Sequence, residues 1–327
     1  MEKGSIWNKR SNGMLIKQIF QALGVAVALP SILLSMVGEP EQIPQEPVTE
    51  IVETMPEAEV EKSVYIPVVK ADGRLEAMEL EEYVSRVVLG EMPMNFEVEA
   101  LKAQAVATRT YTMRRVQRGD KHNGAVCTNY ACCQAYREPE DYLEKGGTQE
   151  KLDRLWDAVE QTRGQVLRYD GELISATYFS SAGGSTEDAA AVWGSSVPYL
   201  VAVPSPEDAS EKTLTFKPKE FQSKLGVTLE GNPTKWFGKI TYTAGGGVKT
   251  IEIGGKTYTG TKLRSLLGLR STVFTVTAKE DSVSISTQGF GHRVGMSQYG
   301  ADAMAVTGST YDQILLHYYP GTALTKL

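Results

Sequence analysis

The feature that most constrains this chain is a run without charge near its N-terminus. The nineteen residues from Ile19 to Val37 include no Asp, Glu, Lys or Arg. As an α-helix rising ~1.5 Å per residue, the run would be about 28 Å long, close to the thickness of the hydrocarbon core of a bilayer. We therefore predict one N-terminal transmembrane helix over residues 19–37, with a separately folded part beyond it.

Basic residues before this run predict its orientation. Residues 1–18 contain four Lys or Arg against Glu2, a local charge of +3. Because positively charged flanks stay in the cytoplasm, we expect a cytoplasmic N-terminus, a single pass through the cell membrane and an extracytoplasmic remainder. A cleaved signal peptide is the alternative, but its apolar segment is usually about 7 to 15 residues and ends in an Ala-x-Ala-like site. The residues around Val37 do not resemble such a site.

A linker rich in Pro and Glu follows. Residues 38–62 hold eight Glu against Lys62, together with four Pro and no aromatic residue. Such a segment offers too little apolar surface to offset chain entropy, and Pro and like charges keep it extended. The formal net charge of −6 comes from this acidic linker, and residues 63–327 are nearly neutral. Without a basic excess, a nucleic acid is not an expected partner.

Helices are predicted at several places in the folded part. Apolar residues recur every three or four positions from 79 to 88, which indicates an amphipathic helix. Asn95 is a good N-cap for a second helix over about 96–118, which Gly119 would end. Further helices are expected around residues 152–159 and 311–318.

Strands are predicted on both sides of Asp170-Gly171. This dipeptide separates residues 165–169 from residues 172–178, and it is a strong signal for a two-residue hairpin turn. Farther along the chain, residues 273–277 and 283–287 alternate polar and apolar side chains, as strands do.

The distribution of these elements predicts an α+β fold with two lobes. Residues 63–200 and 288–327 would form the core lobe, and the Gly-rich, strand-rich residues 201–287 would form an inserted second lobe. We expect a groove between the lobes.

Glu91 is the first candidate for chemistry. It lies four residues after Val87 and seven after Val84, so a helix that persists this far would place its carboxyl on the apolar face. Partial desolvation favours the neutral carboxyl and would make Glu91 a general acid near neutral pH. The alternative is a solvated glutamate in the last helical turn.

Polar residues on the next predicted helix are candidates for binding. Lys102, Gln104, Arg109 and Tyr111 stand among small residues there, and Lys102 and Arg109 are seven positions apart, on one helix face. They would form either a row of donors along a groove or an ordinary solvated basic face.

Four blocks of residues carry a resemblance to a known family. They are Gly90-Glu91-Met92-Pro93 with Glu99–Tyr111, then Tyr178–Gly184, Gly295–Ala301 and His317–Gly321. The blocks occur in the same order as in the stage II sporulation protein D family and span nearly all of residues 63–327. The chain therefore resembles that family. Members of that group are membrane-anchored lytic transglycosylases that act on peptidoglycan during engulfment of the forespore, and related amidase enhancers share the domain.

The resemblance implies an activity and its residues. Glu91 would be the catalytic acid and base that cleaves the β-1,4 bond between N-acetylmuramic acid and N-acetylglucosamine, giving 1,6-anhydro products. A non-catalytic, glycan-binding amidase enhancer is the alternative. The substrate groove would be lined by Lys102, Gln104, Arg109, Tyr111, Tyr178, Ser180, Ser181, Gln298 and Tyr299.

The resemblance also implies partners and a location. A peptidoglycan amidase would strip stem peptides so that this protein receives denuded strands, and a membrane scaffold protein would gather both enzymes at the sporulation septum. One departure is visible, because Arg293 stands where the family usually has a Gly in Gly-His-Gly-Val-Gly-Met-Ser. Arg293 needs room that a Gly does not.

All three cysteines lie in one short segment with a histidine. His122, Cys127, Cys132 and Cys133 match a tetrahedral zinc set in residue type, although the spacing is not that of a standard zinc finger. A disulfide with one thiol left over, or three free thiols, are alternatives outside the membrane. Clostridial members of the resembled family carry zinc in this loop through two His and two Cys, and Cys132 stands where the second His would be.

Any such zinc would be structural. Four protein ligands leave no open position for a water molecule, and Glu91 already supplies the proton chemistry, so no cofactor is required for the reaction. A zinc hydrolase at this loop is a further, weaker alternative.

Overall fold

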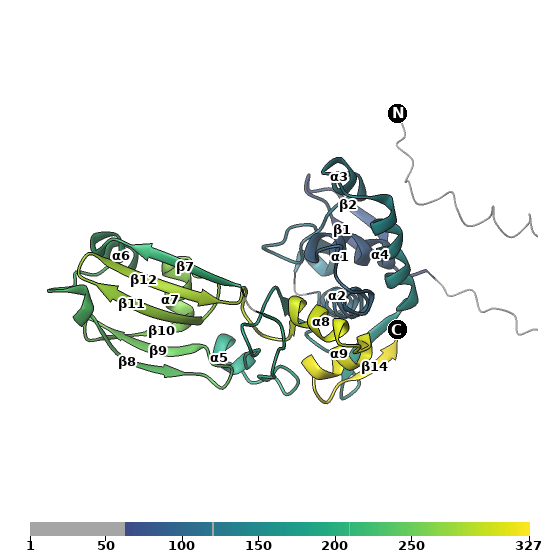
Figure 1. Cartoon of the computed structure of the whole chain (residues 1–327). Helices are drawn as coiled ribbons and strands as arrows, with labels where there is room; N and C mark the ends of the chain where they lie inside the picture. The colour runs from purple at the N-terminus through teal and green to yellow at the C-terminus, as the bar shows by residue number, and fades with distance from the viewer. Residues whose placement is uncertain (1–62, 120, 209) are drawn as a thin grey trace, which may run out of the picture. The chain divides into compact units, whose positions relative to one another are not determined.

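The computed structural model describes residues 63–119, 121–208 and 210–327 (Figure 1). The predicted cytoplasmic flank, the transmembrane helix over residues 19–37 and the linker all fall within residues 1–62, outside the described part. Among the described residues, no helix is both long enough and apolar enough to cross a membrane. The fold mixes helices with small sheets, so the predicted α+β class is confirmed.

Helix α2 (Val98–Arg118) is the centre of the helical part. Its small side chains, such as Ala100 and Ala103, are fully buried, which lets neighbouring helices approach closely. The helices that pack on it are α1 (Leu80–Glu91), α4 (Gln149–Gln161), α8 (Gln298–Val306) and α9 (Tyr311–Tyr318). The two remaining short helices of this part are α3 (Pro139–Glu144) and α5 (Ala189–Trp193), with a 3₁₀ turn at His122–Gly124.

The start of α2 differs from the prediction. Its N-cap is Glu97, not Asn95, because residues 93–96 form a turn closed by a hydrogen bond from the Phe96 amide to the Pro93 carbonyl. The Glu97 amide donates to Asp302 Oδ1 of α8 at 2.7 Å. The carboxylate of Asp302, which is distant in sequence, therefore accepts the hydrogen bond from a backbone amide that a nearby side chain usually caps.

Small sheets surround the helices. Strand β1 (Tyr65–Val69) pairs antiparallel with β2 (Leu75–Glu79) and parallel with β3 (Val126–Cys127). Strand β6 (Tyr178–Phe179) pairs parallel with β13 (Met296–Ser297).

The predicted hairpin is confirmed at its turn but not in the length of its second strand. Strand β4 (Gln165–Tyr169) pairs with β5, which covers only Glu172–Leu173, and β14 (Ala323–Lys326) occupies the other edge of β4. Asp170 and the following Gly both have positive φ, as a two-residue hairpin turn of this kind requires. The chain then leaves the sheet, because the Ser175 amide donates to Tyr199 Oη instead of to a strand.

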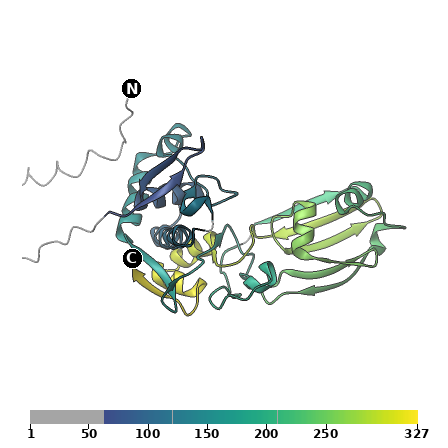
Figure 2. The ribbon, with the colours of Figure 1, turned by 180° about the vertical axis from the view of Figure 1, so that it is seen from behind.

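Residues 211–288 form sheets with an apolar cluster of their own (Figures 1 and 2). One sheet has the order β11-β12-β7 and the other β10-β9-β8. Their bounds are β7 (Glu211–Phe216), β8 (Phe237–Tyr242), β9 (Val248–Ile253), β10 (Lys256–Thr259), β11 (Val273–Lys279) and β12 (Ser282–Gln288). Helices α6 (Pro218–Leu225) and α7 (Gly260–Leu267) and a 3₁₀ turn at Pro233–Lys235 complete this segment. Phe221, Ile251 and Val283 are fully buried in the cluster.

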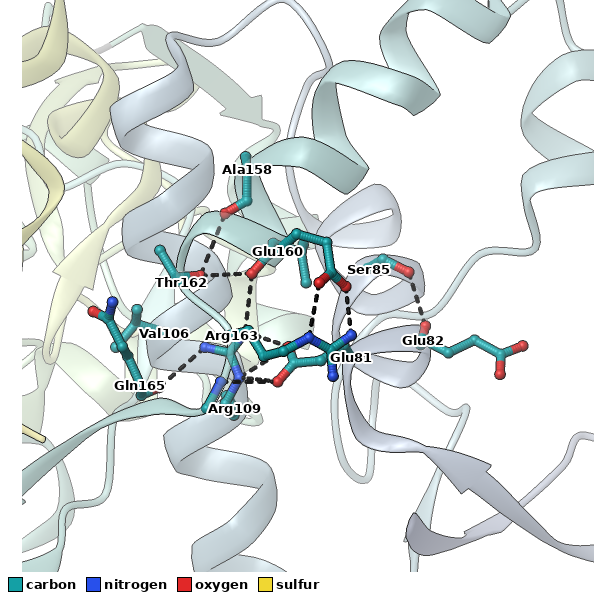
Figure 3. A network of polar contacts seen from close by, with 12 residues as sticks. Glu81, Glu82, Ser85, Val106, Arg109, Ala158, Glu160, Thr162, Arg163 and Gln165 are labelled. Carbon is teal, nitrogen blue, oxygen red and sulfur yellow. Dashed lines mark hydrogen bonds and ion pairs between the residues drawn. The ribbon is translucent and has the colours of Figure 1, made fainter. Parts of the chain in front are cut away.

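A buried ion pair joins α1 to α2 (Figure 3). Arg109 Nε donates to Glu81 Oε1 at 2.9 Å, and a second guanidinium nitrogen contacts Glu81 Oε2. Arg109 Nη1 also donates to the Gln165 carbonyl at 3.0 Å, and the Gly164 amide donates to Glu81 Oε1 at 3.1 Å. Both side chains are buried, so this pair fixes α1, α2 and the start of β4 to one another.

Replacing Arg109 with Met should strongly destabilise the protein. Glu81 would then be a buried carboxylate without its cation, and breaking such a pair typically lowers the free energy of unfolding by about 3–5 kcal/mol. Denaturant unfolding of the full-length chain measures the change. Arg74→Met is the matched control, because Arg74 pairs with Asp72 at the surface, and it should leave stability nearly unchanged. Equal effects of the two substitutions would contradict the role assigned to the buried pair.

Candidate active site

A cavity of about 710 Å³ lies beside the C-terminal end of α1. Its walls include Glu91 from α1, Tyr178 from β6 and Gln298 from α8. The loop after β3 contributes Gln134 and Ala135. These segments are far apart in sequence, and the cavity is large enough for more than one sugar ring.

Glu91 is held at this cavity by two donors. The Ala135 amide donates to Glu91 Oε1 at 2.7 Å, and Tyr178 Oη lies 3.3 Å from the same oxygen. The preceding Gly90 makes this contact possible, because a Cβ there would stand 2.8 Å from the Tyr136 amide nitrogen. The glycine of the Gly-Glu-Met-Pro motif therefore lets the loop at Ala135 reach the carboxyl.

Burial raises the pKa of Glu91 above its ordinary value. The hydrogen bonds from Ala135 and Tyr178, and the nearby Gln298 amide, act in the opposite direction, but desolvation is the largest effect. The prediction that Glu91 continues the apolar face of its helix agrees with this environment. A carboxyl that keeps its proton to a higher pH is suited to act as a general acid.

Tyr178 links Glu91 to a second polar group. Its Oη also lies 2.8 Å from Gln134 Oε1, so the single phenol proton can be donated to either acceptor. Gln134 Nε2 donates to Thr112 Oγ1 at 3.0 Å. Burial, together with the nearby Glu91, raises the pKa of Tyr178 well above its ordinary value, so the phenol keeps its proton. The series of hydrogen bonds from Thr112 of α2 through Gln134 thus orients the phenol of Tyr178 beside the carboxyl of Glu91.

Gln298 offers a donor to the cavity. It is the first residue of α8, whose N-cap Ser297 accepts a hydrogen bond from the Gly300 amide at 3.1 Å. The Gln298 side chain is buried, and its Nε2 has no hydrogen-bond partner among the described residues. Because a buried donor without a partner is unfavourable, this amide is suited to a hydroxyl or carbonyl oxygen of a bound ligand.

Five of the residues predicted from sequence to be catalytic or substrate-binding line this cavity, together with the predicted metal ligand Cys133. They are Glu91, Tyr111, Tyr178, Ser180 and Gln298.

The other predicted groove residues have different surroundings. Lys102 pairs with Glu99 at 2.7 Å, and Gln104 is fully buried and donates to Thr108 Oγ1 at 3.2 Å. The structure places Arg109 in the buried pair described above and not at the cavity, because the carboxylate of Glu81 lies against that face of α2.

Ser181 and Tyr299 also do not line the cavity. Ser181 is buried beside Glu207, with Oγ 3.4 Å from Oε1 of that residue. Tyr299 is partly exposed, and its ring packs edge-on against Phe96 with 4.9 Å between centroids.

Sequence reasoning missed Gln134 and Ala135. The sequence held one signal for them, because both residues directly follow the predicted metal ligand Cys133. A metal bound at that cysteine would fix the loop, and a fixed loop can hold a backbone amide as a hydrogen-bond donor to a nearby side chain. Their contact with Glu91 depends on a fold-back of this loop onto Gly90, which no local pattern indicates.

Arg293 replaces the usual glycine in a strained position. Its φ is 67°, in the left-handed region that favours Gly, and its side chain is fully buried. The guanidinium donates to the carbonyls of Ala182 at 2.8 Å and Ser185 at 2.7 Å, and it lies 3.6 Å from the carboxylate of Glu187. These contacts offset the strain, and a further one to the Gly245 carbonyl ties the turn between β8 and β9 to this loop.

The four candidate metal ligands come together in the structure. The ligand atoms of His122, Cys127, Cys132 and Cys133 all lie within 4.8 Å of one another. His122 Nε2 is 3.2 Å from Cys132 Sγ. The structure has all three cysteines as free thiols and forms no disulfide between them. One imidazole and three thiols at these separations fit a tetrahedral zinc ion.

Comparison with known proteins decides the family. The sequence model of the family described as "Stage II sporulation protein" matches residues 70–169. Stage II sporulation protein D of Bacillus subtilis (strain 168) is 42% identical over 274 residues, which cover 80% of this chain and 79% of that protein. The chain belongs to the stage II sporulation protein D family.

Other relatives agree with this family. Stage II sporulation protein D of Bacillus amyloliquefaciens is 39% identical, over 81% of this chain and 80% of that protein. The amidase enhancer of Bacillus subtilis (strain 168) is 32% identical, over 73% of this chain and 40% of that protein. The resemblance stated from the sequence blocks is therefore confirmed.

Replacing Tyr178 with Phe should raise the pKa of Glu91 further. The phenol favours the charged carboxylate, so its removal leaves burial less opposed. A carboxyl ¹³C titration of the glutamate-labelled full-length chain measures this, with Glu91→Gln assigning the signal. Tyr299→Phe is the control, because that ring packs on Phe96 and should leave the titration unchanged. A lower pKa in Tyr178→Phe would contradict the contact.

Proposed function

We propose that this protein is a lytic transglycosylase that cleaves the β-1,4 bond between N-acetylmuramic acid and N-acetylglucosamine in peptidoglycan during sporulation. The observation that carries the proposal is the composition of the cavity. Among the described residues, Glu91 is the one acidic side chain that lines it, and burial raises the pKa of that carboxyl. The family name, which refers to sporulation, supports the biological setting.

A single carboxyl restricts the mechanism. Ordinary glycosidases use two, one as the acid and one as the nucleophile or base. With one carboxyl, the substrate itself can supply the nucleophile, because the C6 hydroxyl of muramic acid can reach its own C1. The protonated Glu91 gives its proton to the glycosidic oxygen as the C1–O bond breaks. The ionised Glu91 then accepts the C6 hydroxyl proton as the C1–O6 bond forms, so no water is consumed.

The neighbours of Glu91 have separate roles in this scheme. The Ala135 amide and Tyr178 fix the carboxyl, and they stabilise it after it has given up its proton. Gln298 offers its unpaired Nε2 to the glycan, for which the acetamido carbonyl of a sugar is a suitable acceptor. Positioning of this kind supplements general acid–base assistance, which is itself worth roughly 10²- to 10⁴-fold in rate.

Zinc would have a structural role. His122, Cys127, Cys132 and Cys133 would hold it with no open coordination position, so it would supply cross-linking and no reaction chemistry. Cys133 stands two residues before Ala135, whose amide contacts Glu91. Such a cross-link would therefore also constrain the loop that positions the catalytic carboxyl.

The setting of the enzyme is part of the proposal. Residues 19–37 would anchor it in the cell membrane, and residues 38–62 would extend the two-lobed ectodomain toward the wall. Its glycan groove would lie between the lobes. Its partners would be peptidoglycan strands, a peptidoglycan amidase and a membrane scaffold protein. The uncharged N-terminal run and the family support these assignments.

Glu91→Gln should reduce the release of 1,6-anhydro products about 10²- to 10⁴-fold, because the amide keeps the size of the side chain but cannot donate the proton. Chromatography with mass detection of products from purified glycan strands measures the rate. Glu144→Gln, at an exposed position of α3, should cleave at the wild-type rate. Wild-type rates from Glu91→Gln would refute the assignment.

A non-catalytic amidase enhancer is the second candidate, favoured by the relative of that name. The same assay separates the two. An enhancer would give no anhydro products alone, and it would stimulate a peptidoglycan amidase equally well with and without Glu91.

Purified full-length protein should contain one zinc ion, which Cys127→Ser should lose along with thermal stability, because the donor set would be incomplete. Elemental analysis and thermal unfolding check this expectation. Glu91→Gln should keep the metal. A metal-free wild-type protein that is folded and active would contradict the zinc assignment.

A further inference from the structure

Arg264 stands out among the residues that line the cavity. It comes from α7, in the strand-rich segment (Figure 1). It lines the cavity that also contains Glu91. Among the described residues, its side chain has no hydrogen-bond or ion-pair partner, and burial is the only influence on its pKa. By contrast, the buried Arg109 and Arg293 have Glu81 and Glu187 as partners.

The surroundings of Arg264 contain little that could balance its charge. Burial lowers the pKa of Arg264, which shows that the cation is partly removed from water without compensation. Burial, and then the charge of Arg264, lower the pKa of His292, which lines the same cavity, to about 4, so that imidazole is neutral at neutral pH. Phe179 and Phe290 add apolar surface to the same wall.

We propose that Arg264 is a substrate-binding residue that recognises a carboxylate of the glycan. A guanidinium presents a planar set of donors that matches a carboxylate in two parallel hydrogen bonds. The apolar wall strengthens this attraction, because few polar groups screen it. The inference rests on the proposed function, and it adds a charged specificity contact that the sequence blocks of the family do not contain.

Peptidoglycan offers carboxylates from two sources. The lactyl group of muramic acid carries one when no peptide is attached, and stem peptides carry others. An amide bond at the lactyl group removes its charge. If Arg264 contacts the lactyl group, it favours strands without peptides, and if it contacts a peptide, it favours substituted strands.

Binding in the Glu91→Gln background tests the proposal without cleavage. Calorimetry with the full-length chain uses three forms of a tetrasaccharide of alternating N-acetylglucosamine and N-acetylmuramic acid. In the first form the lactyl carboxylates are free, in the second they are capped as neutral methylamides, and in the third they carry stem peptides. Adding Arg264→Met should weaken binding of a carboxylate-bearing form about 10- to 100-fold, as expected for a charged hydrogen-bonded pair.

The pattern of loss identifies the source. A loss with free lactyl groups assigns the contact to the lactyl carboxylate, and a loss confined to the peptide-bearing form assigns it to the peptide. The methylamide form should bind equally with and without Arg264. Arg264→Lys should show a smaller loss than Arg264→Met, because it keeps the charge but not the paired donors.

Lys262→Met is the matched control. Lys262 is exposed on the same helix and does not line the cavity, so its loss should leave all three affinities unchanged. Equal losses for all three forms in Arg264→Met, or no loss in any, would overturn the proposal. If the wild-type chain cleaves glycan but neither cleavage nor binding depends on Arg264, the inference about Arg264 is wrong and the proposed activity stands. If binding depends on Arg264 but the wild-type chain does not cleave glycan, the proposed activity is wrong and the binding role of Arg264 stands.

Discussion

The buried ion pair between Glu81 and Arg109 supports the rest of the helical part. It lies where α1, α2 and the start of β4 meet, and its polar atoms are satisfied by each other and by nearby backbone groups. Two buried charges are tolerated only with such complete pairing. Because α1 is held at this point, its C-terminal end, which carries Glu91, is placed against the loop at Ala135.

The site itself depends on a balance around Glu91. Burial favours the protonated carboxyl, while the Ala135 amide and Tyr178 favour the charged form. The C-terminal end of a helix carries partial negative charge, which also disfavours a carboxylate. An acid–base residue needs access to both states, and these opposing effects provide it.

Prediction from sequence succeeded where the pattern was local. The amphipathic helix before Glu91, the hairpin turn at Asp170 and the last helix were all predicted from spacing or turn residues. The start of α2 and the length of β5 were predicted wrongly, because Asp302 and Tyr199, from distant segments, take the backbone donors concerned. Arg109 shows the same limit at the level of function. The sequence predicted which face of its helix Arg109 lies on, but it did not predict that Glu81 pairs with Arg109 there and keeps it from the cavity.

The sequence by itself determined the family, the apolar face that ends at Glu91 and the set of one His and three Cys, since residue types and short spacings carry that information. The tertiary structure decided which groups meet at one cavity. It brought Ala135 and Tyr178 to Glu91, gathered the four metal-ligand candidates and set Arg264 in the same cavity without an acidic partner. These relations are between residues tens to hundreds of positions apart, and only the packing of the folded chain, which decides what is buried and what is paired, could reveal them.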